Sequence, residues 1–240
     1  MLGKQVVRDA LGRHLPLSLR LFRSIRRIVA DHTRSPEQVF SEVHRTNAWG
    51  DSASLSGGGS NLVESEAIRE ALPSLLHELG IRTLLDAPCG DFFWMRHSDL
   101  AGVHYIGVDV VAKLIEDNQV HFGSPNRQFL HRDLTRDELP RADLVFCRDC
   151  LIHLSYRHIH AVLRNFKATG ARYLLTTQFP LERINHDIVT GSYRPINLCL
   201  DPFGFPEPLR ILRDGPATAS LDTTGQTRVL ALWDLNQLPS

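Results

Sequence analysis

The short stretch LLDAPCGDFFWM, residues 84–95, carries residue types that a cofactor site needs. An apolar run ends at Asp86, and Asp91 follows the only glycine of the stretch, Gly90. A phosphate-binding loop instead gathers backbone N–H groups from several glycines and is followed by Lys and Ser or Thr. Here Pro88 removes one N–H donor, and two carboxylates flank the turn, where they would repel a pyrophosphate. The turn therefore favours a cationic ligand that also offers hydroxyl groups.

The elements that must position this turn alternate between strand and helix. Apolar runs typical of buried strands lie at residues 82–87, 104–110, 127–135, 142–150 and 171–179. Helical patterns lie at residues 62–79, 92–99, 111–122 and 155–170. This alternation predicts βαβ units in a parallel sheet with helices on both faces. With an antiparallel closing pair at residues 209–215 and 227–235, it predicts a doubly wound, mostly parallel, seven-stranded Rossmann-like α/β fold.

In such a sheet the ligand lies at the carboxyl ends of the strands, near the point where the strand order reverses. Acidic residues stand at or near the ends of the first four predicted strands. Asp109 follows Gly90 by 19 residues, which is the spacing at which an acidic residue commonly binds ribose hydroxyls. A nucleoside with a cationic tail and no phosphate fits these strand ends, and S-adenosylmethionine is such a molecule.

Motif by motif, the chain resembles the class I S-adenosylmethionine-dependent methyltransferases over about residues 47–215. The matching segments are DAPCGD at the first turn, YIGVDV at the second strand, and ADLVFCRDCLIHLS at the fourth strand. FLHRDLT resembles the segment that borders adenine in these enzymes. The resemblance is closer to a bacterial subgroup, whose motifs here are WGDSASLSGGGS, DAPCGDFFWM, CRDCLIHLS and RPINL. Members of that subgroup generally carry no assigned substrate.

The resemblance implies a set of cofactor-binding residues at the strand ends. The four residues at the first turn would border the methionine end, Asp109 would bind the ribose, and the residues at 133 and 134 would flank adenine. The full set is Asp86, Cys89, Gly90, Asp91, Asp109, Asp133, Leu134 and Arg148. The chain departs from the commoner family turn, because Pro88 and Phe92 stand where that turn has its first and third glycines. An alternative role for Asp91 and Asp109 is to cap the helices that follow them.

The predicted catalytic residues follow the fourth strand. Transfer of a methyl group requires alignment of the reacting atoms, and a hydroxyl acceptor requires a base within hydrogen-bond reach. In this architecture Arg148, Asp149 and His153 face the methyl group. Asp149 and His153 are four positions apart and would share one helical face. We predict that His153 or Asp149 takes or orients the acceptor proton; the alternative is that His153 is structural.

Two further segments predict contacts with the acceptor. Residues 184–210 form an insertion rich in Pro, Gly and aromatic residues, which is too long for a plain connector. Its polar side chains suit a polyhydroxylated acceptor, and those that we predict to bind it are Asn185, His186, Asp187, Tyr193 and Arg194. Trp49 and residues 56–60 suggest a lid that excludes water, although Trp49 is equally consistent with ordinary core packing.

A metal site is not predicted. Cys147, Cys150 and His153 have the spacing C-x-x-C-x-x-H, but a structural zinc site needs a fourth ligand and no second pair follows. Cys199 stands alone, and the rest of a thioredoxin-like redox pattern is missing. The four cysteines are too sparse for a disulfide scaffold, which favours a reducing cytoplasm.

Charge divides the chain into an arm and a domain. The 240 residues carry a formal net charge of zero, which argues against general nucleic-acid binding. Residues 1–35 contain eight basic and two acidic residues, a net charge of +6. We expect residues 1–46 to form a basic helical arm and residues 47–240 to form the methyltransferase domain. The arm is expected to pack on its own acidic domain, or else to make a peripheral contact with an anionic membrane at the inner membrane face.

The predicted activity is methyl transfer from S-adenosylmethionine to a hydroxyl of a small polar acceptor, such as a sugar or glycan precursor. One alternative is a nitrogen acceptor or a natural product. Another is a binding module that keeps the cofactor fold without chemistry. An NAD-dependent oxidoreductase would place a pyrophosphate at the first turn, which Asp91 and Pro88 oppose. The sequence leaves the acceptor atom and the oligomeric state open.

Overall fold

A computed structural model describes residues 34–50, 54–216 and 228–239 of the chain. The chain divides into two compact units, residues 1–35 and residues 36–240. Residues 1–33 lie outside the described residues, and with them the predicted basic helix. Helix α3, Pro36–Thr46, which we had assigned to the arm, belongs to the larger unit.

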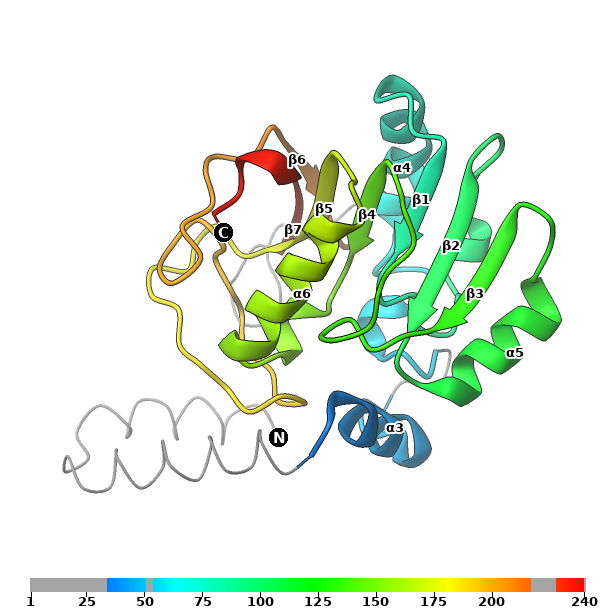
Figure 1. Ribbon diagram of the computed structural model, residues 1–240, viewed down its shortest axis with the longest axis horizontal. Coiled ribbons are helices and arrows are strands. Elements are labelled where there is room, and N and C mark those ends of the chain that lie inside the picture. The colour runs from blue at the N-terminus through cyan, green and yellow to red at the C-terminus, as the bar shows by residue number, and fades with distance from the viewer. Residues whose placement is uncertain (1–33, 51–53, 217–227, 240) are drawn as a thin grey trace. The chain divides into compact units, whose positions relative to one another are not determined.

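A seven-stranded sheet organises the larger unit, with the strand order β3-β2-β1-β4-β5-β7-β6 (Figure 1). The strands are β1 Thr83–Asp86, β2 His104–Asp109, β3 Arg127–His131, β4 Leu144–Cys147, β5 Tyr173–Gln178, β6 Arg210–Arg213 and β7 Val229–Asp234. The first five run parallel, and β7 is antiparallel to both β5 and β6. The predicted fold class is confirmed. The strand order reverses at β1, whose two neighbours are β2 and β4.

Helices cover both faces of the sheet because each helix buries one apolar stripe. Helix α4, Glu66–Glu78, places Ile68, Leu72 and Leu75 in one core cluster, and Ile115 of α5, Ala112–Phe122, joins it. Helix α6, Tyr156–Ala168, buries its own apolar stripe in a second cluster. None of the helices in the described residues combines the length and the apolar character that crossing a bilayer requires.

The predicted helix at residues 92–99 is wrong. The segment folds as turns with one short 3₁₀ turn, Met95–His97. Phe92 has a φ of 56°, which a residue inside an α-helix does not adopt. Its buried ring packs 5.0 Å from that of Tyr105 and 5.1 Å from that of Phe129. Phe92 therefore anchors the turn against β2 and β3.

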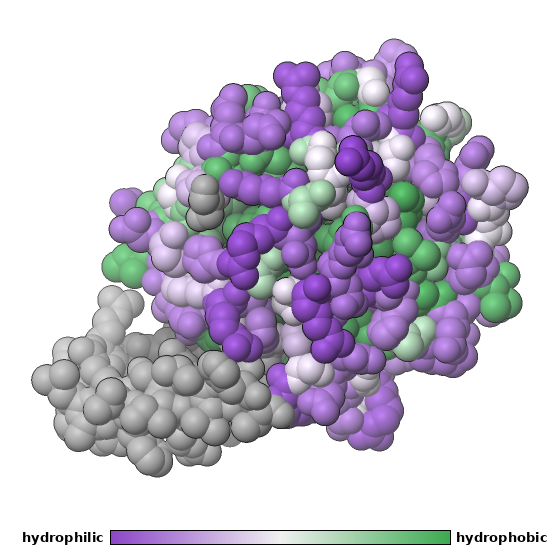
Figure 2. Space-filling view, viewed as in Figure 1, coloured by the Kyte–Doolittle hydropathy of each residue, from purple (hydrophilic) through white to green (hydrophobic). Residues whose placement is uncertain are grey.

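The surface of the described residues is mainly hydrophilic in the view of Figure 2, with apolar residues visible between polar ones. A large exposed aromatic residue is Trp49, whose relative exposure is 38%. It follows α3 and comes before the loop that leads to α4. Its neighbours belong to the candidate site.

Candidate cofactor and acceptor site

A cavity lies at the carboxyl ends of β1, β2, β3 and β4, where the ligand of such a sheet is expected. Its wall also includes Phe40 and His44 of α3 and Ser56 and Ser60 of the following loop. The predicted site residues in its wall are Trp49, Asp86, Cys89, Gly90, Asp109, Asp133, Leu134, Arg148, Asp149 and His153. The predicted residues outside its wall are Asp91, Asn185, His186, Asp187, Tyr193 and Arg194.

Asp86 ends β1 and is buried at the base of the first turn. The hydroxyl of Tyr105 donates a hydrogen bond of 2.5 Å to its Oδ2. Burial raises the pKa of Asp86 to about 8, although the bond from Tyr105 acts to lower it. At neutral pH this carboxyl is therefore largely protonated until a cation comes near it.

Gly90 is required at the turn by the loop that crosses it. Its φ is 55°, and a Cβ built on it would lie 2.2 Å from the Ser56 Oγ. Its N–H donates to Asp109 Oδ2 at 3.0 Å, and its carbonyl accepts from Asn118 Nδ2 at 2.7 Å. Because Gly90 has no side chain, the turn leaves room for the hydroxyl of Ser56.

Asp91 binds this same loop. Its Oδ2 accepts hydrogen bonds of 2.9 Å from the Ser54 Oγ and from the Leu55 N–H. The hydroxyl of Ser56 donates to Asp91 Oδ1 at 3.1 Å and accepts from the Asp91 N–H at 2.9 Å. The side chain of Asp91 is outside the cavity wall. It contributes indirectly, because it holds the loop at residues 54–56, which supplies Leu55 and Ser56 to that wall.

Asp109 and Asp133 supply buried oxygens at the ends of β2 and β3. Asp109 accepts from the backbone N–H groups of Gly90 and Val111, and burial raises its pKa while these bonds lower it. Asp133 Oδ1 accepts from the N–H and the hydroxyl of Thr135. Asp133 Oδ2 is buried and accepts no hydrogen bond within the described residues, although Arg136 Nε lies 3.3 Å away. A buried oxygen in this state suits a ligand donor group.

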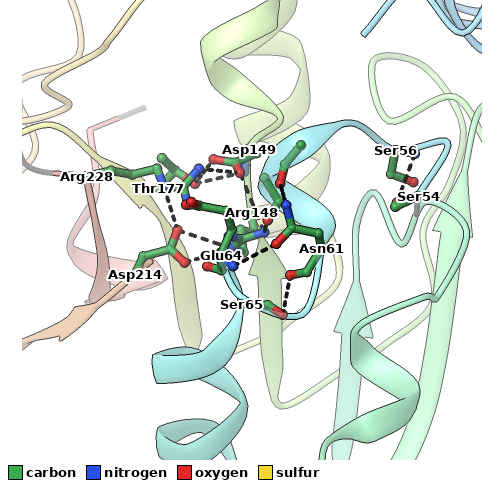
Figure 3. A network of polar contacts seen from close by, with 12 residues as sticks. Ser54, Ser56, Asn61, Glu64, Ser65, Arg148, Asp149, Thr177, Asp214 and Arg228 are labelled. Carbon is green, nitrogen blue, oxygen red and sulfur yellow. Dashed lines mark hydrogen bonds and ion pairs between the residues drawn. The ribbon is translucent and has the colours of Figure 1, made fainter. Parts of the chain in front are cut away.

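Arg148 lies in a buried charge network at the end of β4, shown in Figure 3. Its Nε donates to Asp214 Oδ1 at 2.9 Å and to Oδ2 at 3.1 Å. Its other two nitrogens donate to the carbonyl oxygens of Gly59 and Glu64. Arg148 lines the cavity, but all three of its side-chain nitrogens donate hydrogen bonds to the loop before α4 or to Asp214 after β6. These bonds hold both segments against β4.

Arg228 completes this network, and sequence reasoning missed both it and Asp214. Arg228 Nη1 donates to Asp149 Oδ2 at 3.0 Å, and Arg228 Nε lies 3.1 Å from Asp214 Oδ2. Asp214 is 66 residues from Arg148, and Arg228 is 79 residues from Asp149, so no local spacing connects them. The only available signal was that a buried Arg148 requires some carboxylate partner.

Asp149 is held as a carboxylate. Its φ is 52°, and its N–H donates to the Thr177 hydroxyl at 2.8 Å. Burial is the largest single influence and acts to raise the pKa of Asp149, but Arg228 and Arg148, together with His153 and the Thr177 hydroxyl, outweigh it, and the pKa lies below its ordinary value. A carboxylate stabilised in this way is a weak acceptor for a proton at neutral pH.

His153 lies in the cavity wall with one ring nitrogen fixed by the insertion. It ends a 3₁₀ turn, Leu151–His153, and its Nδ1 lies 2.9 Å from the carbonyl oxygen of Ser192. Because a carbonyl only accepts, Nδ1 carries the proton and Nε2 keeps its lone pair. Burial lowers the pKa of His153 from its ordinary value, although the bond to Ser192 and the charge of Asp149 act to raise it. His153 is therefore neutral at neutral pH.

Most of the predicted polar side chains of the insertion at residues 184–210 form hydrogen bonds within the protein, either inside the insertion or to the segment at residues 151–156. Asn185 exchanges hydrogen bonds with the backbone of Asn197. Asp187 Oδ1 accepts from the first N–H of α6, at Tyr156, at 2.7 Å. Arg194 is buried and donates to the carbonyl oxygens that precede His153.

Within the insertion, His186, Asp187 and Tyr193 are the exposed residues of the predicted set. The ring of Tyr193 lies 5.8 Å from that of His153, so the insertion contacts the site through it. His186 is exposed and outside the cavity wall. Among the described residues, no group of three or more His, Cys, Asp or Glu side chains is arranged to hold a metal ion.

Comparisons with solved structures find the same fold in several methyltransferases. The structure is similar to 1,6-didemethyltoxoflavin-N1-methyltransferase of Burkholderia thailandensis, solved with its substrate and S-adenosylhomocysteine; the TM-score is 0.54, with 17% identity over 83% of this chain and 89% of that chain. It is also similar to magnesium protoporphyrin IX methyltransferase of Synechocystis PCC 6803 with bound S-adenosylmethionine, with a TM-score of 0.50 and 16% identity over 87% of this chain and 99% of that one.

A third similar structure is the methyltransferase domain of a bacterial Hen1 protein, with a TM-score of 0.50 and 11% identity over 70% of this chain and 98% of that chain. No protein-family model matches the sequence, and no curated protein matches it. The chain therefore has the Rossmann-like fold that these methyltransferases share.

Proposed function

We propose that this protein is a class I S-adenosylmethionine-dependent methyltransferase that acts on a hydroxyl group of a small acceptor. The shared fold supports the proposal, since two of the similar structures hold S-adenosylmethionine or S-adenosylhomocysteine. The site residues support it independently, and His153 carries the choice of a hydroxyl acceptor.

Three features of the cavity support binding of S-adenosylmethionine. Asp86, at the first turn, is buried and ready to ionise beside a cationic amino-acid tail. Asp109 offers carboxylate lone pairs beyond its two backbone bonds, which suits ribose hydroxyls. The unbonded Oδ2 of Asp133 suits an amino group on adenine. When bound, the cofactor supplies an electrophilic methyl group on a sulfonium.

His153 is the proposed base. A hydroxyl oxygen becomes an adequate nucleophile when its proton moves to a base during the reaction. His153 Nε2 would accept that proton, and the Ser192 carbonyl would stabilise the resulting imidazolium through Nδ1–H. Asp149, whose charge acts on His153, would favour the same cation electrostatically.

The acceptor class rests on His153 alone. The polar residues of the insertion that suggested a sugar are mostly engaged in hydrogen bonds within the protein, to the insertion itself or to residues 151–156. A sugar or glycan precursor is the acceptor that we propose to test first, since it presents several hydroxyl groups. A nitrogen acceptor and a cofactor-binding module without chemistry are the competing proposals.

The test measures transfer of labelled methyl groups to panels of sugars, phenols and amines. With a working hydroxyl acceptor, His153→Gln should lower turnover about 10²–10⁴-fold while S-adenosylhomocysteine binding is kept. His77→Gln is a matched control, because this histidine of α4 is exposed and outside the cavity wall. Full turnover by His153→Gln, or methylation of amines alone, would contradict the proposed base role. Cofactor binding with no transfer to any acceptor would favour the binding module.

A further inference from the structure

The ring of Trp49 lies directly against the imidazole of His153. The two ring centroids are 5.1 Å apart, and the planes are inclined by 30°, which is a stacked arrangement. The ring of Phe40, from α3, lies 6.2 Å from Trp49. Trp49 is therefore an aromatic link between α3 and the proposed base.

The loop after Trp49 packs closely against it. A Cβ built on Gly57, whose φ is +93°, would lie 3.2 Å from the Trp49 Cβ. Hydrogen bonds tie the adjoining residues Ser54 and Leu55 to Asp91 at the first turn. The position of Trp49 is thus set by segments on both of its sides.

Helix α3 is seated on the cofactor end of the cavity. Phe40 packs against the cluster of Val110, Val111 and Leu114, which follows β2. Glu37 lies 3.6 Å from a side-chain nitrogen of His131 and 3.6 Å from one of Arg136. These exposed ion pairs contribute little energy individually, so apolar packing is the main force that holds α3 here.

Other groups also face His153. The Ser192 carbonyl fixes Nδ1, and the ring of Tyr193 lies 5.8 Å away. Asp149, at the end of β4, favours the charged imidazole, whereas Arg194, from the insertion, disfavours it. None of these groups occupies the place of the Trp49 indole.

We propose that Trp49 is a positioning residue for His153: its indole ring stacks on the imidazole, holds it in the cavity wall and excludes water from it. This proposal rests on the proposed function only for its consequence in catalysis. A base that is both oriented and shielded from water is set for proton transfer before an acceptor arrives.

NMR titration of the histidine ring protons in the full chain tests the contact itself. The protein has 12 histidines, so the His153 signal is identified as the one missing from His153→Gln. Burial lowers the pKa of His153. Trp49→Ala admits water, so the pKa should rise toward its ordinary value, and the ring-current shift from the indole should vanish. Trp49→Phe retains a stacking ring and should restore most of both.

Val63→Ala is the matched control, because Val63 is an exposed apolar residue between Trp49 and α4 and is outside the cavity wall. It should leave the His153 titration unchanged. An unchanged His153 pKa and ring shift in Trp49→Ala would overturn the proposal. An equal change in Val63→Ala would also overturn it, since the effect would then be general loosening.

Kinetics separate this proposal from the proposed function. With a hydroxyl acceptor, Trp49→Ala should lower kcat about 10–10²-fold, the size expected when a reacting group is displaced by about 1 Å. The acidic limb of its pH profile should move to higher pH, and Trp49→Phe should restore it. If His153→Gln keeps full activity, the base role fails, yet the NMR comparison still decides whether Trp49 positions the ring.

Discussion

Asp86 owes its unusual titration to burial, which raises its pKa to about 8, while the hydroxyl of Tyr105 pulls the pKa the other way. Asp149 is also buried, but two arginines lower its pKa. Asp91 is different again, since both of its oxygens bind the loop at residues 54–56. Among these three carboxyl groups, Asp86 is therefore the one that combines a place in the cavity wall with a charge that a cationic ligand can switch near neutral pH.

We predict that cofactor binding releases a proton from Asp86. Below its pKa of about 8 the carboxyl is neutral, and an incoming ammonium group favours the ionised form, so affinity for S-adenosylhomocysteine should rise as pH rises toward 8. Calorimetry in two buffers of different ionisation enthalpy measures the released proton at neutral pH. Asp86→Asn should weaken binding and abolish the release. Wild-type affinity that is flat with pH, with no proton released, would contradict this assignment.

We predict that Gly90→Ala damages the first turn in two ways. A φ of 55° disfavours any residue with a Cβ, and the new methyl group would meet the Ser56 Oγ. The backbone cost alone is about 1–2 kcal/mol, measured as a loss in the free energy of unfolding by chemical denaturation. Adding Ser56→Ala to Gly90→Ala should recover part of the loss. A Gly90→Ala variant as stable as wild type would show that the loop moves away easily.

At the scale of elements, the sequence predicts what local patterns encode. The apolar runs correctly predict the strands of the sheet, and the closing pair β6 and β7 is confirmed as antiparallel. The prediction of a helix at residues 92–99 is wrong. Phe92 in that segment packs against Tyr105 of β2, and a helical pattern in the sequence does not indicate such a long-range contact. Helix α4 contains Pro73 and is not split by it.

The charge network around Arg148 is an element-scale feature that no local pattern predicts. It joins β4, the end of β6 and the residue before β7 through Asp214 and Arg228. Its members lie together because β7 and β6 extend the sheet next to β5, which brings the residues beside these strands close to the end of β4. Their pairing depends on topology, and topology brings together residues far apart in sequence.

We predict that Asp214→Asn destabilises the fold strongly. The side chain of Asp214 is fully buried and that of Arg148 is 4% exposed, so the change leaves two guanidinium groups without their shared carboxylate. Breaking a buried pair costs about 3–5 kcal/mol. Glu78→Gln, which removes the exposed ion pair with Arg210, is the control and should cost no more than about 1 kcal/mol. Equal unfolding free energies for the two variants would contradict the structural importance of the network.

For the whole molecule, the parallel sheet determines where the site lies. Residues at the ends of four strands were predicted to converge, and the cavity at the carboxyl edge brings most of them into one wall. On the acceptor side, the predicted residues Asn185, Asp187 and Arg194 of the insertion form hydrogen bonds within the protein and lie outside the cavity wall. Polar side chains in a long loop serve the ligand or the loop, and sequence alone does not distinguish these uses.

The fold alone does not identify the nucleotide cofactor, since Rossmann-like sheets bind several different ones. The distinguishing feature is the acidic first turn, where Asp86 lies in the cavity wall and Gly90 is crowded by the Ser56 hydroxyl. A cationic methionine tail would favour the ionised form of Asp86 and be attracted to it, whereas a pyrophosphate would oppose that ionisation.

Titration calorimetry of the full chain with S-adenosylhomocysteine, and separately with NAD, tests the central claim most directly. We predict saturable binding of S-adenosylhomocysteine and none of NAD. The same ligand at about 100 times its Kd should raise the free energy of unfolding by about 2.7 kcal/mol. Binding of NAD without binding of S-adenosylhomocysteine would contradict the assignment of this protein as a methyltransferase.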